Sequence, residues 1–488
     1  MKASLPFCAL ALAVGSSLVS AAPPVRPPNF LFIYTDDQRY DAMGVVQREQ
    51  AARARFPWFK TPNLDKLAAD GVRFRNAFVT VSLCSPSRAV FLTGRYTHLN
   101  GVANNHTPFP TNSVTHATVL RAAGYKTGYI GKWHMGNQSG QRPGFDYSAS
   151  YIAHGRYDNC PFEINGVSQP TTGWVDDVAT DFAIAFMRTN KTHPFSLVVG
   201  FKSPHGPRQP PERLKNAFAG EVCGAPLNAT AFAPYLAAKD KAVAAAVKNP
   251  GSEALLNYFR CIAGADENVG RLLATLDELG LAENTMVIYT SDNGYYLGEH
   301  GLGDKRSAYE ESMRIPLLLR YPKLGLKGVA IDEPVLNLDL AQTLIDYAGV
   351  SVPKEMQGRS WRPLLERTGS APIPGWRESF FYEYFYERNF AVPTIFALRT
   401  ESSKLVQYPG HSEWTEVYDV KGDPYETNNL AVDEHHASLR QQLTSEFDHQ
   451  SKSVNFRTPD YADKQSDAES QLPLRKGKKN GKAKRNDD

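Results

Sequence analysis

The sequence contains only five cysteines among 488 residues, and its net charge at pH 7 is +3. A fold held together by disulfides needs a higher density of cysteine, so a disulfide scaffold is excluded. Nucleic-acid binding normally leaves a strong excess of basic residues, which the body of this chain lacks. After the N-terminal segment no run is long and apolar enough to cross a bilayer, so stable membrane insertion is not expected.

Three common catalytic signatures are missing as well. The chain has no G-x-S-x-G nucleophile elbow, no H-E-x-x-H zinc motif, and no G-x-G-x-x-G loop after its first predicted strand. The usual marks of serine hydrolases, zinc proteases and dinucleotide-binding enzymes are therefore absent.

The N-terminus, residues 1–22, is predicted to be a signal peptide. Lys2 precedes an apolar stretch that is short for a membrane span, and small residues around Ala21 offer a cleavage site. We therefore expect an exported protein, periplasmic or secreted. Removal of this segment also removes Cys8. The sequence leaves open one disulfide within the set Cys160, Cys223 and Cys261.

Predicted strands alternate with predicted helices over most of the chain, which indicates an α/β fold. The runs "NFLFIYT", "GYKTGYIGK", "PFSLVVGF" and "NTMVIYTS" are almost continuously apolar, as expected for strands buried on both faces of a parallel sheet. From about Ala371, short strand-like runs follow without long helices between them. We therefore expect a large mixed, mostly parallel sheet sandwiched by helices, with a small C-terminal antiparallel α+β subdomain. The expected division is a catalytic domain, 23–368, the C-terminal subdomain, 369–455, and a basic disordered tail, 456–488.

Acidic and amide side chains directly follow two of the predicted strands. Asp36 and Asp37 end the first strand, and Asp292 and Asn293 end the run "MVIYTS". Each pair alone is also typical of a turn or a helix cap. If both pairs meet at one edge of the sheet, they offer only oxygen ligands, which suit Ca²⁺ or Mg²⁺ better than a soft metal.

Cationic and titratable side chains follow the other predicted strands. Lys132 and His134 stand two apart in "GKWHMG", which puts them on the same side if the strand continues. Lysine neutralises anions, and histidine transfers protons near neutral pH. Further candidates of these kinds are Arg88, Lys202, His205 and Lys305. Around a single cysteine, Cys84, and a hard metal, such residues indicate hydrolysis of an anionic ester.

The segment "CSPSRAVFLTGR", which begins at Cys84, resembles the signature of the type I sulfatases of the alkaline phosphatase superfamily, Cys-x-Pro-x-Arg followed by Thr-Gly-Arg. Other similar fragments are "YTDDQ", "GYKTGYIGKWHMG", "SPHGP", "SDNG", "GEHGLGDK" and "VYDVKGDPYETNNL". Each fragment is weak alone, but their order and number make the resemblance highly specific. It implies an alkaline-phosphatase-like sheet and hydrolysis of sulfate esters.

In that family an export-linked maturation enzyme oxidises the motif cysteine to Cα-formylglycine (3-oxoalanine), so the resemblance implies this modification at Cys84. A hydroxyl of the hydrated aldehyde would attack sulfur and displace the alcohol of the ester. The covalent sulfate hemiacetal would then release sulfate by elimination, as the second hydroxyl loses its proton to His134. The implied metal is Ca²⁺, with Mg²⁺ as the alternative, and its implied ligands are Asp36, Asp37, Cys84, Asp292 and Asn293. The implied catalytic and sulfate-binding residues are Arg88, Lys132, His134, His205 and Lys305. Lys202 matches no family position.

The fragments "DDQRYDAMG" and "LNGVANNHTPF" are similar to those of sulfatases that act on carbohydrates, in particular on N-acetylglucosamine 6-sulfate. The implied substrate is therefore a sulfated carbohydrate. Asn105 and His106 are candidate contacts to sugar hydroxyls, although polar loops of this kind are as often plain surface. Glu299 and His300, before Lys305, could orient their loop or contact the substrate. The run "FFYEYFYERNF" is typical of a half-buried strand, or could line a sugar site.

Two other functions fit the same residues. A phosphate or phosphonate monoester hydrolase of the same superfamily acts on substrates of the same tetrahedral geometry, and some of these enzymes carry the modified cysteine. A non-catalytic, metal-dependent glycan-binding protein would have lost the chemical residues, and no such loss is visible.

Overall fold

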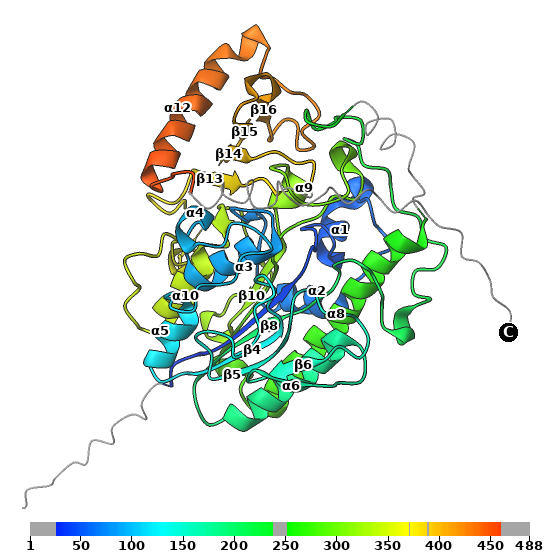
Figure 1. Ribbon diagram of the computed structural model, residues 1–488, viewed down its shortest axis with the longest axis vertical. Helices are drawn as coiled ribbons and strands as arrows, with labels where there is room; N and C mark the ends of the chain where they lie inside the picture. Colours follow the sequence, from blue (N-terminus) through cyan, green and yellow to red (C-terminus); the bar gives the residue numbers. More distant parts are fainter. Residues whose placement is uncertain (1–25, 238–250, 370, 388–389, 460–488) are drawn as a thin grey trace, which may run out of the picture.

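The structure is a computed structural model that describes residues 26–237, 251–369, 371–387 and 390–459. The predicted signal peptide, residues 1–22, and most of the predicted tail lie outside these ranges. Within them, ten strands form one sheet with helices packed against both of its faces (Figure 1). In spatial order the strands are β11 (Val329–Ile331), β2 (Val72–Phe74), β10 (Leu317–Arg320), β9 (Thr285–Ser291), β1 (Asn29–Thr35), β8 (Phe195–Gly200), β4 (Lys126–Lys132), β5 (Tyr147–Tyr151), β6 (Phe162–Ile164) and β7 (Val167–Gln169).

The centre of this sheet is parallel. Strand β1 pairs in parallel with β9 on one side and with β8 on the other, and β4 and β5 continue the parallel series. Strand β10 runs antiparallel beside β9, and β6 and β7 form an antiparallel edge. The predicted large, mixed, mostly parallel sheet is confirmed. The carboxyl ends of its central strands meet at one edge, where ligands bind in open α/β sheets.

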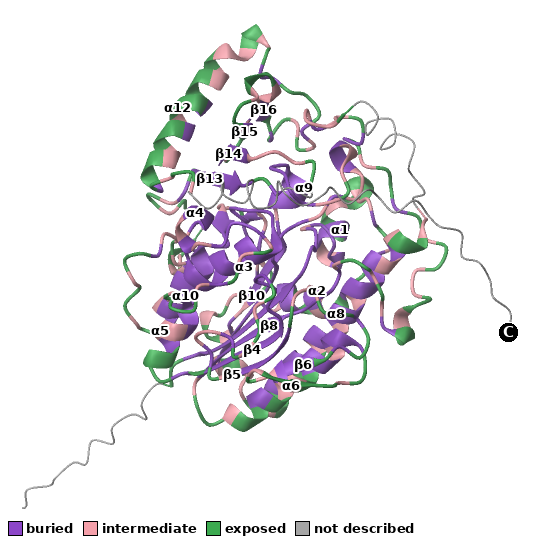
Figure 2. Ribbon diagram, in the orientation of Figure 1, coloured by how far each residue is buried: buried purple, intermediate pink, exposed green. Residues whose placement is uncertain are grey.

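Strand β1 explains why helices cover both faces. Leu31 and Ile33 point into one hydrophobic core, and Phe30 and Phe32 point into another. All residues of β1 are buried (Figure 2). The first core includes α2 (Pro62–Ala69), α6 (Val175–Asn190) and α8 (Glu253–Glu278), and the second includes α3 (Cys84–Thr93), α5 (His116–Ala122) and α10 (Asp339–Tyr347). An almost continuous apolar run therefore corresponds to a strand covered on both sides.

A second, antiparallel sheet follows in the C-terminal part, as the sequence predicted. It consists of β13 (Ser379–Tyr384), β14 (Ile395–Thr400), β15 (Ser403–Gln407) and β16 (Glu416–Asp419), with α12 (Ala437–Ser453) against it. Phe380 and Phe381 share a hydrophobic core with Phe78 and Leu83 of the large domain. All six residues of β13 are buried, so the alternation of aromatic and acidic residues does not mark a half-buried strand. The acidic member, Glu383, has a buried partner instead.

Two smaller questions from the sequence are answered by the described residues. The four cysteines among them are buried and unpaired, so the disulfide left open for Cys160, Cys223 and Cys261 is not present. No helix in the described ranges has the length and apolar character needed to span a membrane.

A buried ion pair links the small sheet to the large domain. His98 lies in α4 (Thr97–Asn100), and its Nδ1 is 2.7 Å from Oε2 of Glu383 in β13. Its Nε2 is 3.1 Å from the carbonyl oxygen of Val454. Because both ring nitrogens face acceptors, the imidazole carries both protons. Burial opposes this charge, but the hydrogen bond to Glu383 raises the pKa of His98 above its ordinary value.

We expect His98→Ala to lower the free energy of unfolding by about 3 kcal/mol, because the variant leaves the Glu383 carboxylate buried without its partner. Since the folded-state pKa of His98 is raised, the stabilisation is complete below the unfolded-state pKa of about 6.5 and is lost as the pH rises through the folded-state value. Urea unfolding at pH about 6 and about 9 measures the difference. The loss should be smaller at the higher pH, and an equal loss at both values would contradict the ion pair. His436→Ala, which removes an exposed histidine–aspartate pair, is the matched control and should change little.

Candidate active site

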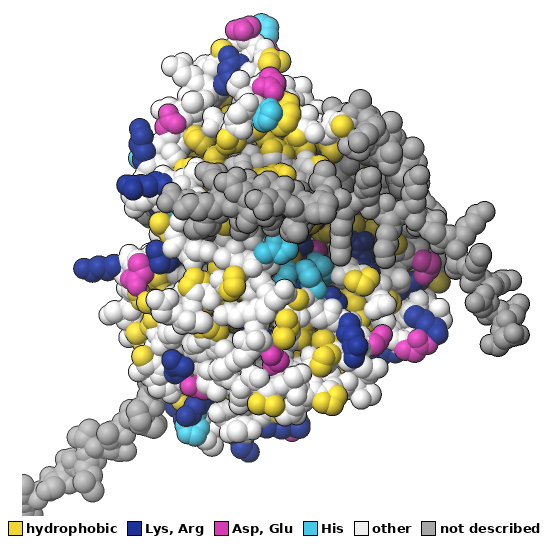
Figure 3. Space-filling view, in the orientation of Figure 1, with side chains coloured by type: hydrophobic (Ala, Val, Ile, Leu, Met, Phe, Trp, Pro, Cys, Tyr) yellow, Lys and Arg dark blue, Asp and Glu magenta, His cyan; other side chains and the backbone are white. Residues whose placement is uncertain are grey.

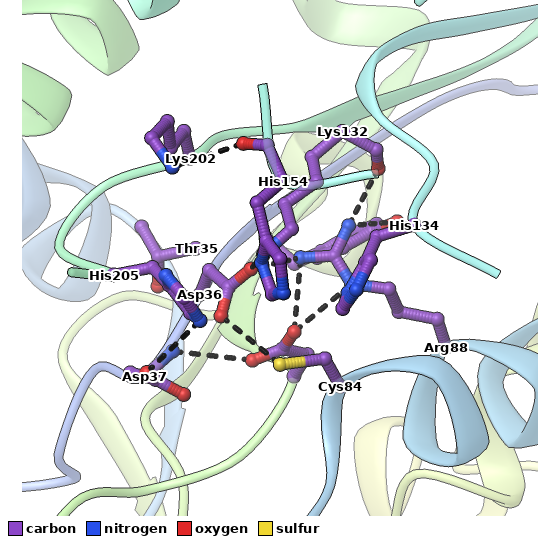
Figure 4. Close-up of polar contacts among 12 residues, drawn as sticks. Thr35, Asp36, Asp37, Cys84, Arg88, Lys132, His134, His154, Lys202 and His205 are labelled. Carbon is purple, nitrogen blue, oxygen red and sulfur yellow. Dashed lines mark hydrogen bonds and ion pairs between the residues drawn. The ribbon is translucent and has the colours of Figure 1, made fainter. Parts of the chain in front are cut away.

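The predicted acidic residues come together at the carboxyl edge of the sheet (Figure 4). Asp36 and Asp37 follow β1, and Asp292 follows β9, its parallel neighbour. Oxygen atoms of these three carboxylates lie within 4.8 Å of one another, and all three residues are buried. A single parallel strand pair therefore joins two parts of the chain that are far apart in the sequence.

The turn after β9 requires the glycine of "SDNG". A Cβ atom on Gly294 would lie 2.1 Å from the carbonyl oxygen of Glu311, so no side chain fits there. The backbone N–H of Asp292 donates to the carbonyl oxygen of Thr35 at 3.0 Å, and the N–H of Asp37 donates to Oδ1 of Asp292 at 3.2 Å. These bonds hold the two acidic turns against each other.

Asn293 completes the oxygen cluster. Its Nδ2 donates to Oδ1 of Asp37 at 2.7 Å and to the carbonyl oxygen of Gly294 at 2.8 Å. Its Oδ1 is buried and has no hydrogen-bond partner among the described residues. Burial, and then the charge of Asp36, raises the pKa of Asp292 to about 7, so this carboxyl needs a nearby positive charge to ionise fully. Three carboxylates and one unpartnered amide oxygen fit a hard divalent cation.

Cys84 is the first residue of α3 and is fully buried beside this cluster. Its Sγ lies 3.4 Å from Oδ1 of Asp36, and the Nζ of Lys305 donates to it at 3.0 Å. Burial, and then the charge of Asp36, raises the pKa of the Cys84 thiol. An unmodified thiol at this position is therefore protonated at neutral pH and is a poor nucleophile.

Arg88 lies one turn further along α3 and binds both acidic turns. Its Nη2 donates to Oδ2 of Asp36 at 2.9 Å, and its Nε donates to Oδ2 of Asp292 at 2.9 Å. The guanidinium carbon is 4.7 Å from the centre of the Tyr34 ring. A planar donor with fixed geometry suits this bridge between two carboxylates, and a lysine could not replace it.

Two lysines form ion pairs with two of these carboxylates. Lys132, at the end of β4, forms an ion pair with Asp36, and Lys305 forms one with Asp37. Although burial opposes ionisation, the charge of Lys132 keeps the pKa of Asp36 well below its usual range. With Arg88 counted, three cations match three carboxylates. A divalent cation would therefore leave the site with excess positive charge, which favours an anionic ligand.

Three histidines form a row at the site (Figure 4). The rings of His134 and His154 are 3.8 Å apart, and those of His154 and His205 are 4.5 Å apart. Burial, and then the charge of Lys132, lowers the pKa of each of these histidines. All three are therefore neutral near pH 7 and able to accept a proton. Figure 3 shows histidine side chains gathered near the middle of this face of the molecule.

The sequence placed Lys132 and His134 on the same side only if the strand continues past Lys132, and it does not. Strand β4 ends at Lys132, and His134 has a left-handed backbone with φ of +45°. The strand alternation therefore does not extend to His134. The turn after β4 brings this side chain to the site.

A cavity of about 480 Å³ opens beside these groups. It is lined by predicted site residues, namely Asp37, His134, His205, Lys305, Asn105 and His106. Lys202 is buried outside the cavity, where its Nζ donates to the carbonyl oxygen of His154 at 2.9 Å.

The predicted substrate contact by His300 does not agree with its position. Its ring is fully buried and stacks on Tyr309, with the ring centres 3.7 Å apart. Its Nδ1 bonds to the carbonyl oxygen of Ala231, and its Nε2 accepts from Asn228. The residues that line the cavity do not include it. His300 therefore supports the loop before Lys305.

Several residues that line the cavity were not predicted individually from the sequence, among them His154, Arg306, Glu387 and Phe390. His154 follows β5, the parallel neighbour of β4, so the same strand-end rule applied to one more strand would have found it. Glu387 and Phe390 come from the C-terminal part of the chain. Both belong to the run "FFYEYFYERNF", for which the sequence had left a role in lining a sugar site open.

A site of this kind favours one class of reaction. Its fixed cations attract a small anion, and its oxygen atoms suit a hard metal cation. Its neutral histidines can accept protons close to the buried residue Cys84. These are the requirements of a metal-assisted hydrolase that cleaves a tetrahedral anionic ester.

The comparisons with known proteins agree: the chain belongs to the sulfatase family. The sequence model of that family matches residues 28–350, and the model described as "N-sulphoglucosamine sulphohydrolase, C-terminal" matches residues 298–453. The protein is therefore a sulfuric ester hydrolase.

Its relatives include carbohydrate-active sulfatases. An N-acetylglucosamine-6-O-sulfatase of Bacteroides thetaiotaomicron is 30% identical, over 93% of this chain and 91% of the relative. An ulvan-active sulfatase of Formosa agariphila is 27% identical, over 89% of this chain and 83% of that protein. A solved structure of a protein in complex with its substrate, D-glucosamine-2-N,6-O-disulfate, superposes with a TM-score of 0.78 at 29% identity, over 89% of this chain and 99% of the other.

Proposed function

We propose that this protein releases inorganic sulfate from sulfate esters on carbohydrates, and that 6-O-sulfated glucosamine units are its substrates. The observation that carries the reaction is the position of Cys84, whose Sγ lies between Asp36 and Lys305. Support for the sugar comes from the relative that is an N-acetylglucosamine-6-O-sulfatase and from the structural neighbour with glucosamine disulfate as substrate.

We propose formylglycine at position 84, installed by a maturation enzyme. Once formed, the hydrated aldehyde supplies a hydroxyl group as the nucleophile. The protonated thiol of an unmodified cysteine cannot act in this way. We also propose Ca²⁺ as the ion, with Mg²⁺ as the alternative. Residue 84 and the oxygen atoms of Asp36, Asp37, Asp292 and Asn293 would hold it, and when bound it would neutralise charge on the sulfate oxygens.

The surrounding residues have distinct roles in this proposal. Arg88 holds Asp36 and Asp292 in fixed positions through its two hydrogen bonds. Lys305, 3.0 Å from Sγ of Cys84, is close enough to bind a sulfate oxygen attached at that position. Lys132 adds positive charge from beneath the cavity, and His205, which lines it, adds a proton donor or acceptor. Such preorganised groups are the main source of rate enhancement for charge that develops during the reaction.

His134 is the proposed proton acceptor. Its Nδ1 is buried and has no hydrogen-bond partner among the described residues, and its lowered pKa keeps it neutral. We expect His134→Ala to lower kcat by about 10²-fold to 10⁴-fold, the usual contribution of a general base. Because the pKa is lowered, the accepting form persists below the ordinary histidine value of about 6.5. The wild-type kcat should therefore stay level between pH about 7.5 and about 6 in a steady-state pH profile. A half-maximal kcat at pH about 6.5 would contradict this role.

We further propose that the protein is exported and that different parts of the chain have different roles. The predicted signal peptide, residues 1–22, is consistent with a periplasmic or secreted enzyme. Residues 23–368 would carry the chemistry, and residues 369–455 would add Glu387 and Phe390 to the cavity wall. The tail, residues 456–488, has no role in the proposal.

Two measurements on protein purified from its native host test the proposal. Mass spectrometry of the tryptic peptide that contains residue 84 should show the aldehyde or its hydrate. Sulfate release should then be faster from 6-O-sulfated glucosamine than phosphate release from the matching phosphate ester. An unmodified thiol in active-site peptides, with no sulfate release, would favour a non-catalytic glycan-binding protein. Faster hydrolysis of the phosphate ester would favour a phosphate or phosphonate monoester hydrolase.

A further inference from the structure

A second cavity lies against the small C-terminal sheet and shares a wall with the active-site cavity. Its volume is about 650 Å³. Much of its lining consists of aromatic rings and prolines, namely Tyr386, Phe390, Phe396, Trp414, Pro393 and Pro409. The sulfatase chemistry described above uses none of the residues that line only this cavity. We call it the aromatic groove.

Phe390 is the wall that the two cavities share. Its side chain is 36% exposed, and the guanidinium carbon of Arg306 lies 3.3 Å from the centre of its ring. Nε of Arg306 in turn donates to Oε2 of Glu387 at 2.6 Å. Arg306 and Glu387 line the active-site cavity. The two cavities are therefore adjacent at Phe390.

The walls of the groove are suited to sugar rings. Tyr386 is 44% exposed, although an aromatic ring of this size is normally covered. Trp414 is half-buried and stacks on His411, with the ring centres 3.7 Å apart and the planes 8° from parallel. Pyranose rings have an apolar face of C–H groups, which packs on flat aromatic rings, and an edge of hydroxyls, which binds water or polar groups. Rigid stacked rings offer such a face at little cost in conformational entropy.

We propose that the aromatic groove binds the neighbouring sugar units of an oligosaccharide whose sulfated unit occupies the active-site cavity. This inference rests on the proposed function and defines its substrate more closely as glycan chains rather than single sugars. The shared wall at Phe390 favours the substrate over an unrelated partner, because a chain that extends from the sulfated unit over this ring reaches the groove. Trp414 and Tyr386 are then determinants of substrate length.

The test compares one sulfated sugar with a chain that contains it. Steady-state kinetics use the full-length modified enzyme with 6-O-sulfated N-acetylglucosamine and with a β-1,4-linked tetrasaccharide that carries one such unit. Trp414→Ala should raise KM for the tetrasaccharide about fivefold, since one stacked ring contributes on the order of 1 kcal/mol. Its kcat and KM for the monosaccharide should not change. Trp414→Phe, which keeps a ring, should restore most of the affinity for the tetrasaccharide.

Tyr386→Ala is the second variant, in case Trp414→Ala does not fold. Tyr386 lies on a different segment of the groove from Trp414, and its replacement by alanine should also raise KM for the tetrasaccharide. If either folded variant changes KM equally for both substrates, or changes KM for neither substrate, the inference is overturned. A wild-type enzyme with the same KM for the two substrates would also overturn it.

Binding of an unsulfated probe separates this inference from the proposed function. The wild-type protein should bind the β-1,4-linked N-acetylglucosamine tetrasaccharide at least about tenfold more tightly than the monosaccharide by calorimetry, and Trp414→Ala should remove the difference. If the protein releases no sulfate but shows this binding, the proposed function fails and the sugar site stands. If binding appears only in a variant that ends at residue 459, the chain's own C-terminal segment occupies the groove and the inference is overturned.

Discussion

Cys84→Ala is expected to lower kcat/KM for a 6-O-sulfated glucosamine by about 10⁴-fold or more, in line with the loss of an enzymatic nucleophile. The variant removes the side chain from which the proposed hydroxyl nucleophile is made. The charged residues around it stay in place, so substrate binding should survive. The measurement is sulfate release under conditions in which the wild-type enzyme is fully modified.

Cys223→Ala is the matched control, because Cys223 is also a buried and unpaired cysteine but lies in an apolar cluster with Phe56 and Phe259. It should cost some stability, as removal of a buried side chain usually does, and leave kcat/KM within about twofold. Thermal unfolding of both variants establishes that each is folded. Activity of Cys84→Ala close to that of the wild type would remove residue 84 from the reaction.

Removal of divalent metal is expected to lower kcat by about 10³-fold, because the ion contributes several kcal/mol of charge stabilisation in the transition state. Stability should fall at the same time. Asp36, Asp37 and Asp292 bring three buried carboxylates within 4.8 Å, and one of them already has a raised pKa. An ion present at about 1,000 times its dissociation constant stabilises the folded state by about 4 kcal/mol, and a chelator withdraws that contribution.

The measurements are sulfate release and thermal unfolding after dialysis against a chelator, followed by addition of Ca²⁺ or Mg²⁺. Recovery of the rate and of the melting temperature with one ion but not with the other identifies the native metal. Asn293→Ala removes the unpartnered Oδ1 and should raise the concentration of ion needed for half-maximal rate by at least about tenfold. If the chelator changes neither the rate nor the melting temperature, the oxygen cluster is not a metal site.

Much of the site could be predicted from single strands of the sequence. Asp36, Asp37, Lys132 and Asp292 each come at or directly after the end of a buried apolar run, and the strand-end rule made a common site for the acidic residues possible. The motif around Cys84 added Arg88, which the helix places one turn away. These predictions depend on local patterns and on one property of parallel sheets, namely that their strands end at the same edge.

Other residues could not be assigned in this way. His300 stands in a motif with Lys305, yet the chain turns its ring away from the cavity to stack on Tyr309. His134 reaches the site through a left-handed turn that strand alternation does not describe. A difference of one turn in a loop decides whether a side chain faces a cavity or a core, and such turns depend on contacts with residues distant in the sequence.

The sequence by itself determined the α/β class of this protein, its mostly parallel sheet and the sulfatase chemistry around Cys84, because apolar periodicity and contiguous motifs are local properties. Only the tertiary structure decided that Glu387 and Phe390 close the cavity and that an aromatic groove continues from it. Both residues belong to the C-terminal part of the chain, nearly three hundred positions after Asn105, whose backbone N–H donates to Glu387. Their position follows from the core that β13 shares with Phe78 and Leu83, a packing between distant segments that no local pattern records.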